Sequence, residues 1–145
     1  MTPLDLEKFD LLQALDDHER EALSEVLERQ QVGRGEILFE EGDPANGLLL
    51  IAEGRLRIKC LRTGDLGELG EGQTIGSASL AGPGPREATA IGAPSGACVY
   101  LLSCDAFQSL VRDEPQLAFK IVEAALRDLA DAIREGLTPI VAAHG

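Results

Sequence analysis

The sequence predicts a mainly β domain that is flanked by helices at both ends. The first observation is the distribution of glycine: none occurs in residues 1–32, 14 of the 16 fall between Gly33 and Gly96, and only Gly136 and Gly145 follow. Glycine destabilises helices and favours turns, so the middle of the chain is expected to be β-rich and the ends helical. Helical spacing of apolar residues at both ends, and short apolar runs between turns in the middle, predict the same arrangement.

The chain is expected to form a single domain, residues 1–145. Its length is the commonest one for a domain and is sufficient to bury a core without a metal or a disulfide. We divide it into N-terminal helices over 4–29, a β-roll over 30–103, C-terminal helices over 104–136 and a loose tail over 137–145.

The N-terminal segment carries apolar residues at helical spacing. They are Leu11, Leu12, Leu15, Leu23, Val26 and Leu27. A polar stretch interrupts this pattern, and Asp16 or Asp17 is expected to cap a second helix that runs to about Arg29. His18 then lies in the first turn of that helix, where we expect it to be exposed.

Short apolar runs predict the strands. They cover 31–32, 37–39, 48–51, 55–59 and 98–102, and glycine-containing turns separate them, among them 33–35, 41–44, 53–54, 63–65 and 71–72. Regular punctuation of this kind is typical of an all-β barrel or sandwich. The apolar run from 97 to 102 predicts a well-buried strand.

Two helices are predicted after the last strand. Ser103 is the expected cap of a short helix over 106–111, and Pro115 the expected first residue of a long helix that ends near Glu135, before Gly136. Within the long helix a heptad-like stripe is formed by Val122, Leu126, Leu129 and Ile133. This stripe packs either on the protein's own barrel or against a second copy in a parallel homodimer, and we favour the homodimer.

Charge and hydropathy exclude several classes of function. The net charge of −12 opposes binding to nucleic acid or to an anionic membrane surface, because both depend on clustered Lys and Arg. No apolar run is long enough to span a membrane, and acidic residues stand where a signal peptide would be basic. We therefore expect a cytoplasmic protein with neither a nucleic-acid nor a membrane partner.

Metal and catalytic sites are not expected either. The three cysteines, Cys60, Cys98 and Cys104, lack metal-ligand spacing and are expected to be free thiols. The serine-containing segment 76–79 is not a G-x-S-x-G nucleophile motif, and no histidine lies near it in sequence. The sequence therefore predicts a protein that is not an enzyme.

Residues 73–89 are the strongest candidate for a binding site. Gly76 opens a small-residue stretch that is expected to begin a helical turn, and a Gly-Pro-Gly-Pro loop then leads to Arg86. Exposed main-chain N–H groups attract an anion, and a guanidinium matches two phosphate oxygens. The alternative is that Arg86 pairs with a surface carboxylate such as Glu87 or Glu71.

Three segments, in this order, resemble the cyclic nucleotide-binding domain family, which includes bacterial catabolite activator-type regulators and protein kinase A regulatory subunits. Residues 35–43 (GEILFEEGD) are similar to the family's early strand and turn, and residues 48–58 (LLLIAEGRLRI) to the hairpin that follows. Ile75-Gly76 together with 85–89 (PREAT) resembles its phosphate-binding cassette. The resemblance covers roughly residues 7–135 and implies a jelly-roll β-barrel.

The resemblance also implies a ligand, cAMP or cGMP, and a set of residues that bind it. These are Gly76, Ser77, Ala78, Arg86, Glu87 and Ala88. Ser77 stands where the family usually has a glutamate that holds the ribose, a difference expected to cost about 1–2 kcal/mol of binding. Glu87 stands where the family has a small residue, and it either points outward or repels the phosphate. The purine cover is expected from the long helix, with Leu126, Leu129 and Ile133 as candidates.

Two functions follow as expectations. The first is a regulatory module that senses a cyclic purine monophosphate and signals through its C-terminal helix to a protein partner. The second is a degenerate member of the fold that acts as a protein–protein adaptor without a ligand. No winged helix-turn-helix is expected, because only about nine residues follow Gly136.

Overall fold

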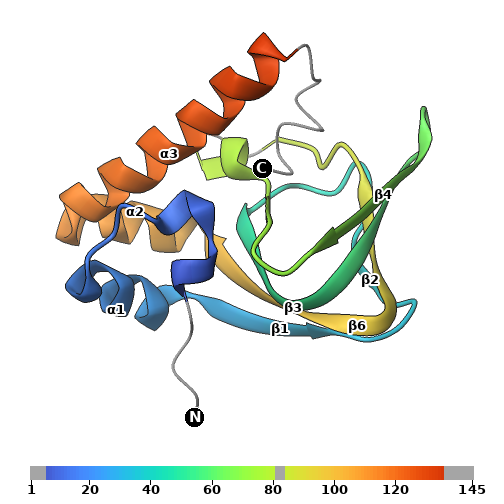
Figure 1. The fold of residues 1–145 in the computed structure, drawn as a ribbon, viewed down its shortest axis with the longest axis horizontal. Coiled ribbons are helices and arrows are strands. Elements are labelled where there is room, and N and C mark those ends of the chain that lie inside the picture. The colour runs from blue at the N-terminus through green and yellow to red at the C-terminus, as the bar shows by residue number, and fades with distance from the viewer. Residues whose placement is uncertain (1–5, 81–83, 136–145) are drawn as a thin grey trace.

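The computed structural model describes residues 6–80 and 84–135, and it places the helices on one side of a curved sheet (Figure 1). The helical elements are η1 (Leu6–Lys8), η2 (Asp10–Leu12), α1 (Asp17–Val26), η3 (Ser77–Leu80), α2 (Cys104–Asp113) and α3 (Pro115–Arg134). The strands are β1 (Glu28–Val32), β2 (Ile37–Phe39), β3 (Gly47–Cys60), β4 (Gly64–Gly70), β5 (Thr74–Ile75) and β6 (Thr89–Ser103). The predicted mainly β fold with flanking helices is therefore confirmed.

The described strands form one antiparallel sheet. Its order is β1-β6-β3-β4, with β2 also paired to β6 and β5 also paired to β3. The predicted jelly roll is therefore curved but not closed, because β1 and β4 end this path without pairing to each other among the described strands.

Two long strands, β3 and β6, form the centre of the sheet. The runs predicted as separate strands over 48–51 and 55–59 are one continuous strand, β3, and the predicted strand over 98–102 is the end of β6. A turn was predicted at residues 53–54, but Gly54, at φ +76°, lies at a register shift between β3 and β6. A bulge of this kind bends a long strand without ending it.

The N-terminal helix is shorter than predicted. Asp16 is its cap: the Asp16 side chain accepts a hydrogen bond from the Glu19 N–H at 2.8 Å, and the Glu19 side chain accepts one from the Asp16 N–H at 3.0 Å. The helix ends at Val26 rather than near Arg29, because β1 pairs with Ala97–Leu101 of β6 from Glu28 onward. Upstream of α1, the expected first helix consists of two single 3₁₀ turns, η1 and η2.

The C-terminal helices agree with their predicted caps. The Ser103 hydroxyl accepts a hydrogen bond from the Ala106 N–H at 3.0 Å, and α2 extends from Cys104 to Asp113 around the predicted segment. Pro115 is the first residue of α3, which ends at Arg134. The predicted stop at Gly136 and the predicted loose tail over 137–145 lie outside the described residues.

Two apolar clusters stabilise the fold, one on each face of the central strands. Leu48 and Leu50 of β3 face the helices and pack with a cluster that includes Leu12, Leu23 and Ile121. Their neighbours face the interior of the roll, where the cluster includes Leu49, Ile51, Leu56, Val99 and Leu101. This division follows from the alternation of side chains along a strand.

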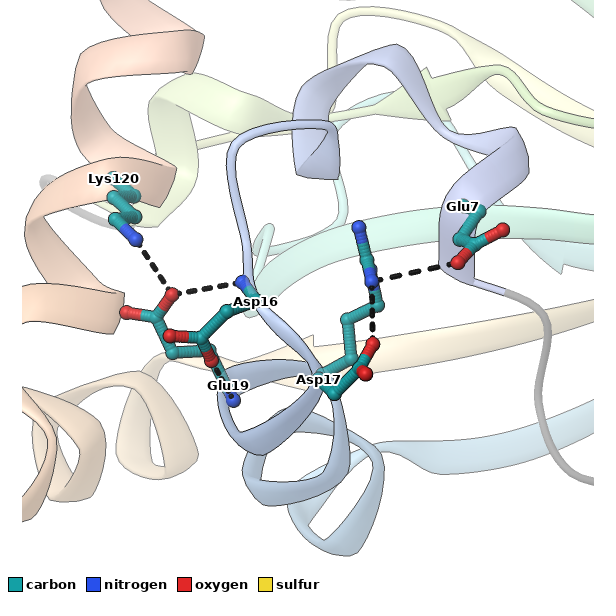
Figure 2. Close-up of polar contacts among 6 residues, drawn as sticks. Glu7, Asp16, Asp17, Glu19 and Lys120 are labelled. Carbon is teal, nitrogen blue, oxygen red and sulfur yellow. Dashed lines mark hydrogen bonds and ion pairs between the residues drawn. The ribbon is translucent and has the colours of Figure 1, made fainter.

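A partly buried ion pair joins α1 to α3. Glu19 is 5% exposed, and its carboxylate accepts a hydrogen bond from Lys120 Nζ at 2.6 Å as well as the one from Asp16 (Figure 2). The same carboxylate therefore completes the cap of α1 and neutralises a lysine of α3. Its two partners compensate for its removal from water.

Candidate functional site

The candidate site is built around the turn between β5 and η3. Gly76 occupies this turn with φ +84°, a conformation that side chains other than glycine rarely adopt. A Cβ atom at this position would lie 2.6 Å from Nη1 of Arg86 and 3.1 Å from the Gly47 carbonyl oxygen. Glycine is therefore required here both by the backbone conformation and by the close approach of the arginine.

Arg86 points inward and is only 7% exposed. Its Nη2 donates a hydrogen bond at 3.5 Å to the Gly47 carbonyl, and its guanidinium lies 4.5 Å from the centre of the Phe39 ring. Burial lowers the pKa of this guanidinium, while the nearby Cys104 and Asp43 act in the opposite direction. Among residues 6–80 and 84–135, the guanidinium thus has one long hydrogen bond to a neutral acceptor and a stacking contact in place of a full set of acceptors.

No carboxylate within 6–80 or 84–135 forms an ion pair with Arg86. Glu87 is exposed on the surface, and Glu71 pairs with Lys8 at 3.1 Å. The alternative, in which Arg86 pairs with a surface carboxylate such as Glu87 or Glu71, is therefore wrong among the described residues. Of the two orientations considered for Glu87, the structure has the outward one.

The loop that carries Arg86 is fixed by main-chain hydrogen bonds to the turn at residues 42–45. The Arg86 N–H donates to the Asp43 carbonyl at 2.7 Å, and the Arg86 carbonyl accepts from the Gly42 N–H at 2.8 Å. Two residues before Arg86, the Gly84 carbonyl accepts a hydrogen bond from the Ala45 N–H at 2.7 Å. These bonds hold the backbone of Arg86 in place, so that only its side chain is free to adjust.

The other predicted cassette residues are adjacent in sequence to Gly76 or to Arg86. Ser77 and Ala88 are each 7% exposed, and Ala78 lies within η3. Of these residues, Gly76 is the one that lies directly against the Arg86 guanidinium, 2.6 Å from Nη1 for an added Cβ, and Ser77 and Ala78 follow it in η3.

Four further residues belong to this site and were not singled out from the sequence: Phe39, Gly47, Ser79 and Cys104. The Ser79 hydroxyl lies 2.7 Å from the Gly47 carbonyl oxygen, and the Cys104 thiol donates to the Ser79 carbonyl at 3.2 Å. The Phe39 ring could have been anticipated from strand alternation, which separates it from Leu38. No local signal points to the others, because β3, η3 and α2 bring them together from distant parts of the chain.

The residues proposed to cover the purine are not buried by the rest of the described structure. Leu126 and Ile133 are 65% and 70% exposed, and Leu129 is partly exposed. The expectation that these side chains close the site is therefore not met in this conformation. The alternative in which the stripe packs on the protein's own barrel is wrong for the same reason.

His18 and the three cysteines were the other residues considered as ligands or catalytic groups. His18 has a 76% exposed side chain and lies 3.4 Å from Glu114. Cys60, Cys98 and Cys104 are free thiols. Within the described ranges, no group of His, Cys, Asp or Glu is arranged to hold a metal ion, and no helix has the length and apolar character of a membrane span.

A curved antiparallel roll with helices at both ends is the jelly-roll architecture. A family model described as the cyclic nucleotide-binding domain matches residues 29–114, which is more than half of the chain. The chain therefore belongs to the cyclic nucleotide-binding domain family.

Individual relatives support this assignment. The chain is 32% identical over 113 residues to the cAMP-dependent protein kinase regulatory subunit of Hypocrea atroviridis, a match over 73% of this chain and 22% of the relative. It is 28% identical over 109 residues to the cAMP-dependent protein kinase type II regulatory subunit of Drosophila melanogaster, over 73% of this chain and 29% of that protein. The chain thus spans less than a third of the length of these relatives.

Solved structures give the same result. The N-terminal domain of a transcriptional regulator from Streptomyces coelicolor A3(2) superposes with a TM-score of 0.78 at 28% identity, over 93% of this chain and 97% of that one. The catabolite activator protein of Thermus thermophilus superposes with a TM-score of 0.71 at 29% identity, over 86% of this chain and 60% of that one.

Proposed function

We propose that this chain is a regulatory module that binds a cyclic purine monophosphate, cAMP or cGMP, through Gly76, Ser77, Ala78, Arg86, Glu87 and Ala88. The observation that carries the proposal is the environment of Arg86: a 7% exposed residue whose guanidinium, among residues 6–80 and 84–135, donates to one carbonyl at 3.5 Å. A buried charge of this kind is costly unless an opposite charge meets it. The phosphate of a cyclic nucleotide would supply that charge and two acceptor oxygens.

Family membership supports the same ligand class. The chain belongs to the cyclic nucleotide-binding domain family, and two of its relatives are named as cAMP-dependent kinase regulatory subunits. Ser77 offers a hydroxyl as a ribose partner in place of a carboxylate. We therefore expect a weaker ribose contact, with most of the affinity supplied at Arg86.

Calorimetric titration with cAMP and with cGMP tests the proposal. We expect heat of binding from the wild-type protein and a loss of about 10- to 150-fold in affinity in Arg86→Ala, the range for a charged hydrogen bond. Arg57→Ala is the matched control, because Arg57 is an exposed arginine of β3 paired with Asp65 and Glu68. Absence of heat from the wild type at high micromolar nucleotide would contradict the proposal.

We further propose that the signal leaves the module through α3, to a protein partner and through a homodimer of α3. The supporting observation is the exposed apolar stripe on this helix, in which Phe119, Val122, Leu126 and Ile133 are 64%, 45%, 65% and 70% exposed. Ligand binding would shift α3 against the roll, as a shift between two populated packings. The role is regulatory rather than enzymatic, and we propose a cytoplasmic location.

An adaptor that retains the fold without a ligand is the second candidate. It is favoured by the same exposed stripe and by the neutral Ser77. A pull-down distinguishes the two functions, because an adaptor recovers the same partner with and without nucleotide, and equally with Arg86→Ala. A sensor changes its partner recovery on addition of nucleotide only when Arg86 is present.

A further inference from the structure

Ser79 is a buried serine beside the candidate cassette, and its hydroxyl is shared between two carbonyls. The side chain is 6% exposed. Its Oγ lies 2.7 Å from the Gly47 carbonyl oxygen and 2.6 Å from the Gly76 carbonyl oxygen. A hydroxyl has one hydrogen, so it can donate a full hydrogen bond to only one of these two carbonyls at a time.

The two carbonyls differ in their other donors. The Gly76 carbonyl also accepts from the Ser79 N–H at 3.0 Å, so it remains satisfied when the hydroxyl turns away. The Gly47 carbonyl has Arg86 as its other side-chain donor, at 3.5 Å. The Ser79 hydroxyl and the Arg86 guanidinium therefore share one acceptor on β3.

Neither Gly47 nor Ser79 is free to move away. Gly47 lies where β3 crosses β6, and a Cβ atom on it would be 2.1 Å from the Leu102 carbonyl oxygen. Ser79 is held to the start of α2, where the Cys104 thiol donates to its carbonyl at 3.2 Å. Both partners of the shared hydrogen bond are thus fixed, and the adjustable group is the guanidinium.

We infer that Ser79 is a positioning residue that frees Arg86 for an anion. When the guanidinium turns from the Gly47 carbonyl to a phosphate, the Ser79 hydroxyl turns fully to that carbonyl and leaves no buried acceptor without a donor. Without the hydroxyl, binding of an anion by Arg86 would leave the buried Gly47 carbonyl without a side-chain donor. The cost of that unsatisfied carbonyl opposes binding. This role rests on the proposed function, because it concerns the same arginine.

The first test compares cyclic nucleotide affinity by calorimetry. In Ser79→Ala we expect the dissociation constant to rise about tenfold, and in Ser79→Thr, which retains a hydroxyl, we expect affinity close to that of the wild type. Ser95→Ala is the matched control, because Ser95 also bonds to a main-chain carbonyl but lies on β6, away from the cassette. Equal affinities in wild type and Ser79→Ala would overturn the inference and leave the proposed function standing.

The second test needs no ligand and therefore separates the two ideas. NMR of protein with ¹⁵N-labelled arginine measures rotation of the Arg86 guanidinium about its Nε–Cζ bond. In Ser79→Ala the guanidinium is the remaining side-chain donor to the Gly47 carbonyl, so its rotation should be slower than in the wild type. An unchanged rate overturns the inference. If the wild type binds no nucleotide, the proposed function fails and this rate alone decides the role of Ser79.

Discussion

Individual residues of this domain show how burial determines their chemistry. Arg86 is an arginine in a glycine–proline loop by sequence, but its side chain is buried against Phe39 rather than paired at the surface. Among the described residues its side-chain hydrogen bond is to one neutral carbonyl at 3.5 Å, and burial lowers the pKa of the guanidinium. This arrangement is costly for the fold and favourable for binding an anion.

Asp128 of α3 shows the same effect in a carboxylate. Burial raises its pKa above the ordinary value of 3.8, and the negative charges of Asp131 and Asp10 raise it further, while Arg127 opposes them. The folded protein thus binds the Asp128 proton more tightly than the unfolded chain does. The stability gained from this tighter proton binding is fully present at pH values below 3.8. It is lost as the pH rises through the raised pKa of Asp128 and the carboxyl ionises.

Asp128→Asn is therefore expected to stabilise the protein at pH 7, by about 0.2–0.5 kcal/mol, the usual size of a like-charge repulsion on a helix. The gain should shrink when the pH is lowered to about 3.5, where the wild-type carboxyl becomes protonated. Thermal unfolding of both proteins at the two pH values measures the difference. A variant that is less stable than the wild type at pH 7 would contradict this account.

Among the elements, the pairing of β3 with β6 depends on two facing glycines. Gly54 and Gly96 have φ values of +76° and +72°, and a Cβ atom on Gly54 would lie 2.1 Å from the Gly96 carbonyl oxygen. The two long strands approach closely here, so a side chain on Gly54 would push them apart.

Gly54→Ala is expected to destabilise the fold more than a left-handed glycine alone would explain. Gly64 is the matched control, since it has φ +79° but no atom within 4 Å of an added Cβ. We expect Gly64→Ala to cost about 1–2 kcal/mol for the backbone conformation, and Gly54→Ala to cost a further 1–3 kcal/mol, approximately, for overpacking. Urea unfolding measures the free energy of unfolding of both variants. Equal decreases in the two variants would show that β3 and β6 move apart without an added cost.

The long helix α3 has two apolar faces, one buried and one exposed. Leu117, Ala118, Ile121 and Ala125 are buried against the rest of the domain. The predicted stripe lies on another face, and the structure extends it by one position, to Phe119, which is 64% exposed. From Phe119 to Ile133 the steps alternate between three and four residues, which is the spacing of a two-helix seam.

At the scale of the whole molecule, this exposed stripe makes a dimer the expected assembly. Leu126→Asp places a charge in the middle of the stripe of each copy. In the proposed dimer this change removes two leucine side chains, one from each copy, from the buried interface, so the dimer dissociation constant should rise at least about 100-fold. Analytical ultracentrifugation checks this at micromolar concentration. Leu61→Asp is the control, because Leu61 is 93% exposed and lies in the turn after β3.

A dimer that persists in Leu126→Asp and dissociates in Leu61→Asp would place the interface elsewhere. A wild-type protein that stays monomeric at every concentration would show that the stripe serves another partner. The acidic surface, with a net charge of −12, would then favour a basic one.

Much of the fold was predictable from local sequence rules. Asp16, Ser103 and Pro115 stand at helix starts as their chemistry predicts, since capping depends on groups within a few residues. The alternation of Leu48 to Ile51 between two cores follows from strand geometry alone. The three segments around Gly42, Gly54 and Gly76 were sufficient to identify the family.

Other features were decided only by the tertiary structure, because they depend on contacts between distant segments. Pairing with β6 ends α1 at Val26 and joins two predicted runs into β3. The inward position of Arg86 depends on Phe39 and Gly47, which lie about 40 residues away in sequence. By itself the sequence determined the fold class, the starts of α1, α2 and α3 and the family, because these depend on local chemistry and motif spacing. Long-range packing decided how far each strand extends and which polar groups are buried, because these depend on partners distant in sequence.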